Sequence, residues 1–290
     1  MIQDPQTAAS ASDYAYCSDL VRGEDKDRWL AALFVPAQAR HHIHALYAFN
    51  IEMSRVSETV SEPLLGEIRL QWWRDILEGK EPGDAKASPV AAALVDTIVQ
   101  HDLPKAPLIK LIEARLSREV YDDPIDSAAA LESYAEATSA NLFRLAALML
   151  GGKEAVAAYD AAGNAGIAYA VTGLLRALPW NLARGQIFIP ADFLAKHGAA
   201  REELIAGQVS PGAYAALDEL RTLARAHLAA FAEKLPGVSR KFRPALLPAA
   251  LCEPYLKQAE RPGYHPLKSI VELPQWKRQW YLWRASRRWS

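Results

Sequence analysis

Three carboxylates stand close together in the segment "DDPID" at residues 122–126. They are Asp122, Asp123 and Asp126. Carboxylate oxygens are ligands that Mg²⁺ prefers, so a metal clamp is one interpretation. Pro124 interrupts any helix that would align these carboxylates, and Asp126 or Ser127 is suited to cap a helix that begins next. We therefore interpret the segment as a corner between two helices and keep the metal clamp as the alternative.

Histidines cluster in "HHIH" at residues 41–44. His41 and His44 are three residues apart, so they share one face of a helix, as paired metal ligands often do. No further ligand stands at a useful spacing from them. We interpret both histidines as structural.

Two arginines flank a pair of tryptophans in "RLQWWRDIL". Trp72 and Trp73 are suited to core packing, with the stems of Arg69 and Arg74 lying along apolar surface and their charges in water. Anion binding by either arginine is the alternative.

The composition excludes several classes of function. The 290 residues carry a formal net charge of −1, so no nucleic-acid partner is expected. Cys17 and Cys252 form no metal-binding spacing. The first residues, "MIQDPQTAASASD", have neither the basic nor the apolar region of a secretory signal. No apolar run reaches the roughly 18 to 20 residues that span a bilayer. We expect a cytoplasmic protein.

Apolar residues recur with the helical period along most of the chain, and no alternating strand pattern is convincing. Proline at the first turn and glycine after the last turn mark helix ends, as at Pro63 and Gly79. The pattern predicts one all-α domain over residues 13–290, preceded by a flexible segment at 1–12. The expected helices lie at about 36–60, 63–78, 90–101, 105–120, 128–150, 153–182, 190–197, 211–235, 240–258 and 274–288.

Three segments resemble the squalene/phytoene synthase family. They are "LFVPAQARHHIHALYAFNIEMSRVSE", "EIRLQWWRDIL" and "GLLRALPWNLARGQIFIPADFL". The resemblance extends over nearly the whole chain in the order and spacing of the family. It implies an isoprenoid synthase-type helical bundle around a central cavity, with the helix at about 36–59 facing the helix at about 153–182.

The family's enzymes ionise a prenyl diphosphate with the help of Mg²⁺, which aspartates on two facing helices hold. In the first motif, Tyr47 and Phe49 match the family. The family's arginine and three aspartate positions are occupied here by Ile51, Ser54, Arg55 and Glu58. Only Glu58 is a carboxylate. Arg55 brings positive charge to a site that would collect cations, although it could simply pair with Glu52 on the helix surface.

In the second motif, Arg176 matches the family, but its aspartate positions hold Ala177 and Asn181. The family's amide positions one and two turns earlier hold Gly173 and Ala170, and Pro179 and Trp180 stand beside the second clamp. We interpret these positions as an inherited pocket that has lost its metal site. No catalytic, cofactor-binding or metal-binding residue is assigned.

The resemblance implies a non-catalytic role. Members of the family that lack both acidic motifs include an assembly factor for respiratory complex I (NADH:ubiquinone oxidoreductase). The segment "LLRALPWNLARGQIFIP" and the tail are more similar to that branch than to the synthases. The expected partners are therefore assembly intermediates of complex I. The alternatives are a Mg²⁺-dependent transferase that condenses isoprenyl diphosphates, and an isoprenoid- or lipid-binding protein in which Ser54, Glu58 and Asn181 line a polar pocket.

The tail "QWKRQWYLWRASRRWS" at residues 275–290 combines tryptophan with basic residues. As a helix it places Trp276, Trp280 and Trp283 on one face. Its basic residues are Lys277, Arg278, Arg284, Arg287 and Arg288. This combination is typical of a helix that lies at an anionic membrane surface, here the inner membrane. The alternative is a terminal helix that packs its tryptophans onto the bundle and leaves its arginines in solvent. Both interpretations hold together if Trp289 and the last arginines project beyond the packed part.

Overall fold

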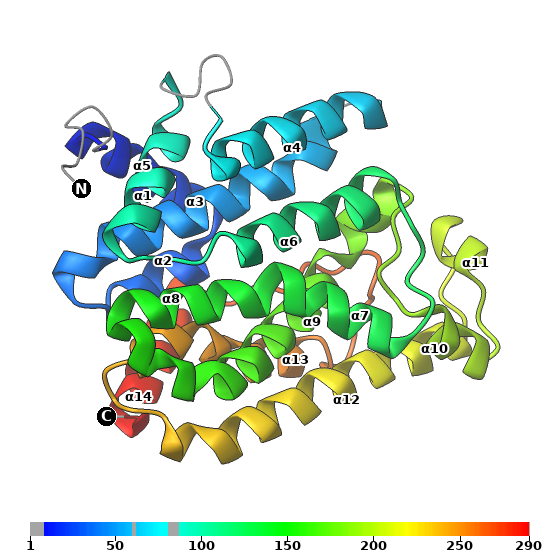
Figure 1. Ribbon diagram of the computed structural model, residues 1–290. Coiled ribbons are helices and arrows are strands. Elements are labelled where there is room, and N and C mark those ends of the chain that lie inside the picture. The colour runs from blue at the N-terminus through cyan, green and yellow to red at the C-terminus, as the bar shows by residue number, and fades with distance from the viewer. Residues whose placement is uncertain (1–8, 60–61, 81–86, 290) are drawn as a thin grey trace.

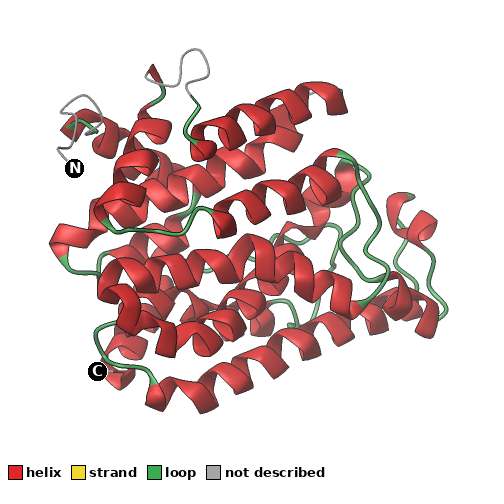
Figure 2. Cartoon of the chain, viewed as in Figure 1, coloured by secondary structure: helices red, strands yellow, loops and turns green. Residues whose placement is uncertain are grey.

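Helices make up the fold. The computed structural model describes residues 9–59, 62–80 and 87–289, and no strand occurs within those ranges (Figure 2). Helices α3, α4, α6 and α8 run across the molecule in neighbouring rows, and the long helix α12 packs against α9 (Figure 1). The predicted all-α fold is confirmed. None of the helices in the described ranges is long and apolar enough to span a bilayer.

The α-helices are α1 (Ala11–Glu24), α2 (Lys26–Ala32), α3 (Ala37–Thr59), α4 (Pro63–Glu78), α5 (Pro89–Gln100), α6 (Ala106–Arg115), α7 (Ala128–Ala135), α8 (Asn141–Gly151), α9 (Tyr159–Ala183), α10 (Ala191–Lys196), α11 (Arg201–Ile205), α12 (Pro211–Lys234), α13 (Cys252–Gln258) and α14 (Gln275–Trp289). The π-helical turns are η2 (Leu116–Val120) and η3 (Glu136–Ala140). The 3₁₀ helices are η4 (Gly152–Ala158), η5 (Leu235–Gly237) and η6 (Arg243–Leu251).

Local sequence explains where several helices begin and end. The side chains of Ser88 and Ser210 accept hydrogen bonds from the first turns of α5 and α12, and a proline follows each serine. Helix α4 ends at Gly79, whose φ of 86° suits a residue without a Cβ.

Two helices near the N-terminus were not predicted. Helix α1 begins with a capping box in which Ser10 and Asp13 bond each other's backbone N–H. It buries only Cys17 and Val21, so its apolar pattern is weak. Residues 1–8 lie outside the described ranges, so most of the predicted flexible segment 1–12 does too.

Four expected helices are less regular than predicted. The stretch at 105–120 ends in the π-helical turn η2, and the stretch at 128–150 contains the π-helical turn η3. The first six residues of the stretch at 153–182 belong to the 3₁₀ helix η4. The stretch at 240–258 begins with η6, which has Pro248 in its interior. Proline has no N–H to donate, which disfavours a regular α-helix there.

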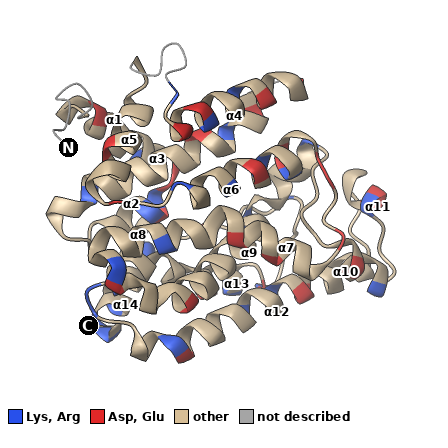
Figure 3. Ribbon diagram, viewed as in Figure 1, with Lys and Arg blue, Asp and Glu red and all other residues tan. Residues whose placement is uncertain are grey.

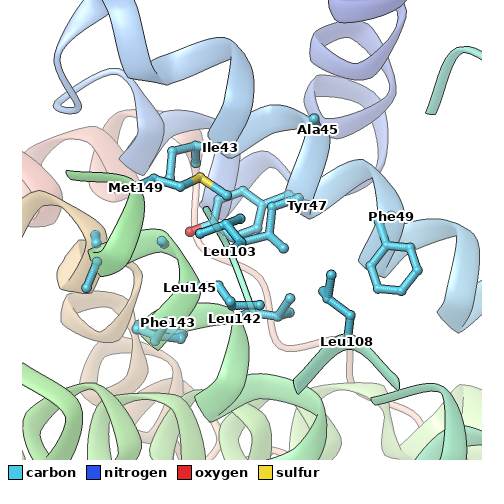
Figure 4. Packing of buried hydrophobic residues seen from close by; sticks show 14 of the residues in the cluster. Ile43, Ala45, Tyr47, Phe49, Leu103, Leu108, Leu142, Phe143, Leu145 and Met149 are labelled. Carbon is cyan, nitrogen blue, oxygen red and sulfur yellow. The ribbon is translucent and has the colours of Figure 1, made fainter. Parts of the chain in front are cut away.

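The largest apolar core joins α3 to α5, α6 and α8. Ile43, Phe49, Leu108 and Phe143 are among its fully buried side chains (Figure 4). Small residues bring α9 close to its neighbours: a Cβ on Gly166 would lie 2.3 Å from the Cα of Ala140. Helix α9 is thereby held among α8, η3 and α12, where it faces α3 across a cavity.

Candidate functional site

The central cavity has a volume of about 380 Å³ and lies between α3 and α9. Helix α3 contributes Asn50, Ser54, Ser57 and Glu58, and α9 contributes Tyr169, Ala170, Gly173, Leu174, Ala177 and Asn181. The remaining lining residues are Asp25, Arg28, Arg115, Glu119, Tyr134, Thr138, Ser139, Arg184, Gln186 and Phe188. The cavity therefore brings together five of the predicted pocket positions: Ser54, Glu58, Gly173, Ala177 and Asn181.

One arginine connects the two motif helices. Arg184, just after α9, donates from Nη1 to Oε1 of Glu58 at 3.0 Å. Its Nη2 donates to Oδ1 of Asn181 at 3.2 Å. The guanidinium thus supplies a positive charge to the only carboxylate that remains at a family aspartate position.

Three predicted pocket positions lie away from the cavity wall. Ile51 is buried in the main apolar core. Tyr47 is buried behind Arg28. Arg55 forms an ion pair with Glu24 of α1 at 2.7 Å. The predicted surface pair of Arg55 with Glu52 is wrong, because Glu52 instead pairs with Arg69 of α4 at 3.3 Å.

A buried ionic network forms the wall opposite the motif positions. Arg115 Nη1 donates to both oxygens of Glu119, at 2.6 and 2.8 Å, and Nη2 donates to Asn50 Oδ1 at 2.9 Å. Tyr134 donates its hydroxyl to Glu119. Burial, and then the charge of Glu119, raise the pKa of Tyr134 well above its ordinary value, so the phenol stays protonated.

Arg28 of α2 forms a second buried cation on this wall. Its guanidinium lies 5.2 Å from the ring centre of Tyr47 and 4.7 Å from that of Tyr169. It also pairs with Asp25 at 3.1 Å. Burial raises the pKa of Tyr47 to about 12, although the charge of Arg28 opposes the shift. Each of these arginines is therefore already neutralised by a neighbouring carboxylate.

Donors remain on the wall. Arg28 Nε, Arg115 Nε and Ser139 Oγ are buried and have no hydrogen-bond partner among the described residues. Buried polar groups are seldom left unsatisfied. Buried water is the usual partner of such groups.

The geometry does not fit the Mg²⁺ that the family's motifs would hold. Mg²⁺ needs several oxygen ligands around one point, with carboxylates among them. The corresponding positions hold a serine, an alanine and an amide, and the carboxylate of Glu58 is engaged by Arg184. In the described ranges, no group of three or more His, Cys, Asp or Glu side chains is arranged to hold a metal ion.

A second cavity, of about 420 Å³, contains Arg176 and shares Gly173 with the central one. At its base, buried Asp27 accepts hydrogen bonds from Tyr255 at 2.8 and 2.9 Å. Asp27 also forms ion pairs with Arg176 at 3.1 Å and with Arg278 of α14 at 3.3 Å. Burial raises the pKa of Asp27, and the charge of Arg176 opposes that shift. Arg176, which matches the family motif, therefore serves an ionic cluster that fixes α2, α9 and α14 together.

The carboxylates of "DDPID" lie in an exposed corner between η2 and α7. Asp122 pairs with Arg201 at 2.8 Å, and Asp123 accepts a hydrogen bond from Ser117. Ser127, rather than Asp126, caps α7. The corner interpretation fits these contacts.

The ring of His41 lies 4.0 Å from that of His42, tilted by 39°, and meets the ring of Tyr14 edge-to-face at 4.5 Å. His44 is buried. The two predicted structural histidines therefore pack within the bundle. In α4, Trp73 is buried in the core and Arg74 pairs with Glu78 and Glu113 at 3.2 and 3.1 Å.

The tail forms helix α14 as predicted, with one face exposed to solvent and the other packed against the bundle. Trp276, Trp280 and Trp283 are 65%, 44% and 52% exposed. The cations of Lys277, Arg284 and Arg287 lie over these three rings, respectively, at 5.3, 5.1 and 5.9 Å. The alternative in which this stripe packs onto the bundle does not describe the structure. Leu282, Ala285 and Trp289 make the inward contacts, and Arg278 turns toward Asp27.

Sequence reasoning missed the ionic half of the cavity wall. Arg115 and Glu119 stand four apart, which is the one local signal for an ion pair between them. Arg28 and Arg184 each have one partner three residues away, Asp25 and Asn181, but the ring of Tyr169 and the carboxylate of Glu58 reach them from distant parts of the chain.

The chain matches the squalene/phytoene synthase family over residues 21–284. It belongs to this family. The rat protein named NADH dehydrogenase (ubiquinone) complex I, assembly factor 6 is 31% identical over 256 residues, covering 87% of this chain and 76% of the rat protein. The phytoene synthase of Thermus thermophilus is 26% identical over 287 residues, covering 96% and 94%.

Solved structures confirm the predicted bundle. A dehydrosqualene synthase superimposes with a TM-score of 0.81 at 19% identity, covering 96% of each chain. The squalene synthase of Alicyclobacillus acidocaldarius gives 0.72 at 23% identity, covering 88% of this chain and 95% of that one. At these identities the likeness concerns the fold alone.

Proposed function

We propose that this member of the family is non-catalytic and acts in the assembly of respiratory complex I. The observation that carries the proposal is the guanidinium of Arg184 between Glu58 and Asn181. A diphosphate-ionising enzyme needs several carboxylates at these positions to hold metal ions, whereas this chain keeps only Glu58 there and pairs it with Arg184. The identity of 31% to a relative named as a complex I assembly factor supports the role.

The absence of catalysis is tested directly. Purified protein is incubated with labelled farnesyl or geranylgeranyl diphosphate and Mg²⁺, and both substrate and products are followed. We expect no condensation product and no release of diphosphate. Turnover of about 1 per second or more, which is ordinary for enzymes, would support the alternative of a prenyltransferase.

The assembly role is tested in the organism that encodes the chain. Deleting the gene is expected to lower NADH:quinone oxidoreductase activity and the amount of assembled complex I in membranes. Succinate:quinone oxidoreductase activity in the same membranes is the control and should not change. Re-expression of the wild-type chain should restore complex I. Normal complex I in the deletion strain would contradict the role.

We further propose that α14 attaches the protein peripherally to the inner membrane, where complex I is assembled. Tryptophan rings and basic side chains together favour the interface of an anionic bilayer. The exposed rings of Trp276, Trp280 and Trp283, each beneath a cation, supply both.

Liposome flotation tests the attachment. The full chain should float with anionic vesicles, and less so in high salt. Replacing Trp280 and Trp283 by alanine should reduce flotation. Trp180→Ala is the matched control, because Trp180 is 48% exposed but lies on α9. Equal flotation of all three proteins would show that α14 is not the membrane contact.

A further inference from the structure

A groove of about 430 Å³ lies beside α14, between that helix and the start of η6. Its lining residues are Phe34, Arg240, Arg243, Pro244, Leu247, Trp283, Ser286, Arg287 and Trp289. Three of them are arginines and none is acidic. We call this surface the basic groove.

The three arginines differ in what their guanidinium groups do. Arg243 donates to the backbone carbonyls of Val238, Trp289 and Pro236, so it fixes the end of α14 to the chain before η6. Carbonyls satisfy its N–H groups, but they do not cancel its charge. This fixed cation forms one wall of the basic groove.

Arg240 and Arg287 supply the free donors. Both side chains are exposed, and neither forms a hydrogen bond or ion pair within the described ranges. Arg287 lies over the ring of Trp283 at 5.9 Å, which leaves its N–H groups available. A guanidinium with free N–H groups matches two oxygens of a phosphate.

The basic groove is also amphiphilic. Phe34, Leu247 and Trp283 give it apolar walls beside the arginines. Trp283 belongs at the same time to the exposed stripe of α14, so the groove opens where that stripe lies. Figure 3 shows the Lys and Arg positions of α14 and of the segment that lies beside it.

The opposite flank of α14 differs in charge. The smaller cavity there is lined by Arg284, Arg288 and Lys257, but also by Glu253, which pairs with Arg225 at 3.0 Å. An anion would meet a carboxylate on that flank and only cations in the basic groove.

We propose that the basic groove binds the phosphate of an anionic phospholipid headgroup, with Arg240 and Arg287 as the contacting residues and Arg243 as a fixed cation. The inference rests on the proposed membrane attachment of α14 and adds a defined lipid site to it. The apolar walls would contact the glycerol and upper acyl part of the same lipid.

The test compares two double variants of the full chain that remove the same charge from the two flanks. Arg240→Gln with Arg287→Gln is expected to weaken partition into vesicles of phosphatidylcholine and phosphatidylglycerol by roughly tenfold or more, because each basic residue near an anionic surface contributes about fivefold. Arg284→Gln with Arg288→Gln should weaken it less. All four side chains are exposed, so both variants should fold.

A second measurement separates a lipid from a free anion. Dihexanoyl phosphatidylglycerol, kept below its micelle concentration, should raise the melting temperature of the wild-type chain but not of the Arg240/Arg287 variant. Inorganic phosphate at the same concentration should have little effect. An equal rise with inorganic phosphate would overturn the lipid assignment.

The outcomes distinguish the two proposals. If the wild-type chain does not float with any vesicle, the attachment of α14 fails and the lipid site fails with it. If the chain floats and the two double variants lose affinity equally, attachment stands, but the basic groove is not a defined site.

Discussion

Glu58 of α3 and Asn181 of α9 face each other across the cavity and share one guanidinium, that of Arg184. In a metal-dependent relative, the carboxylates of the two motif helices would be balanced by bound Mg²⁺ between them. Here the cation beside Glu58 is a side chain of the same protein, in a partly exposed ion pair. The charge of Glu58 is therefore balanced within the chain.

The position of Arg184 beside Glu58 predicts that new carboxylates alone will not make the cavity bind Mg²⁺ well. The triple variant Ser54→Asp, Ala177→Asp and Asn181→Asp adds carboxylates while Arg184 remains. Adding Arg184→Gln removes the guanidinium and leaves Glu58 and the three new aspartates without a neighbouring cation. Bound Mg²⁺ would reduce the repulsion among these carboxylates. We expect millimolar Mg²⁺ to raise the melting temperature of the quadruple variant more than that of the triple variant or wild type.

Neither variant should consume farnesyl diphosphate, because Ile51 and Gly173 still depart from the family pattern. Calcium in place of Mg²⁺ is a useful control for the size of the site. Identical Mg²⁺ responses in the triple and quadruple variants would show that Arg184 does not occupy the position of the cation.

The buried pair of Arg115 and Glu119 should matter far more to stability than a similar pair on the surface. Glu119→Ala leaves the Arg115 charge buried without its carboxylate, which typically costs about 3–5 kcal/mol. Glu78→Ala removes one of the two carboxylates that pair with Arg74, in a partly exposed pair with the same spacing, and should leave stability almost unchanged. Urea denaturation of the purified variants measures both free energies of unfolding. Similar losses in the two variants would contradict the buried network.

Helix ends were predictable because their signals are local. A proline at the first turn with a serine before it marks α5 and α12, and Gly79 ends α4. The same kind of signal, Ser10 with Asp13, was present for α1 but lacked a strong apolar face behind it. The periodicity alone therefore missed a helix that its capping box indicated.

The motif positions were predictable, whereas the groups that bind them were not. The resemblance singled out Ser54, Glu58 and Asn181, and all three line the central cavity. Arg184 reaches Glu58 across 126 residues of sequence, and Arg176 reaches Asp27 across 149. Contacts of this kind depend on tertiary packing, and no spacing in a single sequence encodes them.

Two glycines of α9 should respond in opposite ways to alanine. A Cβ on Gly166 would lie 2.3 Å from the Cα of Ala140, so the backbone of one helix would have to shift to make room for it. Gly166→Ala should therefore lower the free energy of unfolding by about 1–3 kcal/mol. A Cβ on Gly173 meets nothing within 4 Å, because this residue faces the cavity. Gly173→Ala should stabilise the helix by up to about 1 kcal/mol. Thermal unfolding of both variants tests the pair, and destabilisation by Gly173→Ala would contradict an open cavity at that turn.

The histidines beside α1 make stability depend on pH. His42 is buried, its Nδ1 lies 2.9 Å from Thr97 Oγ1, and its ring centre lies 4.5 Å from that of His101. Burial, followed by the charges of His41 and His101, lowers the pKa of His42 to about 4. Asp96 is the nearby group that opposes the shift.

The sign of the effect follows from proton linkage. In the unfolded chain His42 has its ordinary pKa of about 6.5, so between about pH 6.5 and 4 the unfolded state binds more protons than the folded state. Its contribution to stability is therefore present above that window and is lost as the pH falls through it. We expect the melting temperature of the wild-type chain to fall from about pH 7 to about pH 5, and His42→Asn to reduce that fall even if its melting temperature at neutral pH is lower. His265→Asn, outside the cluster, is the control and should retain the wild-type slope. A slope unchanged by His42→Asn would show that other groups cause the acid sensitivity.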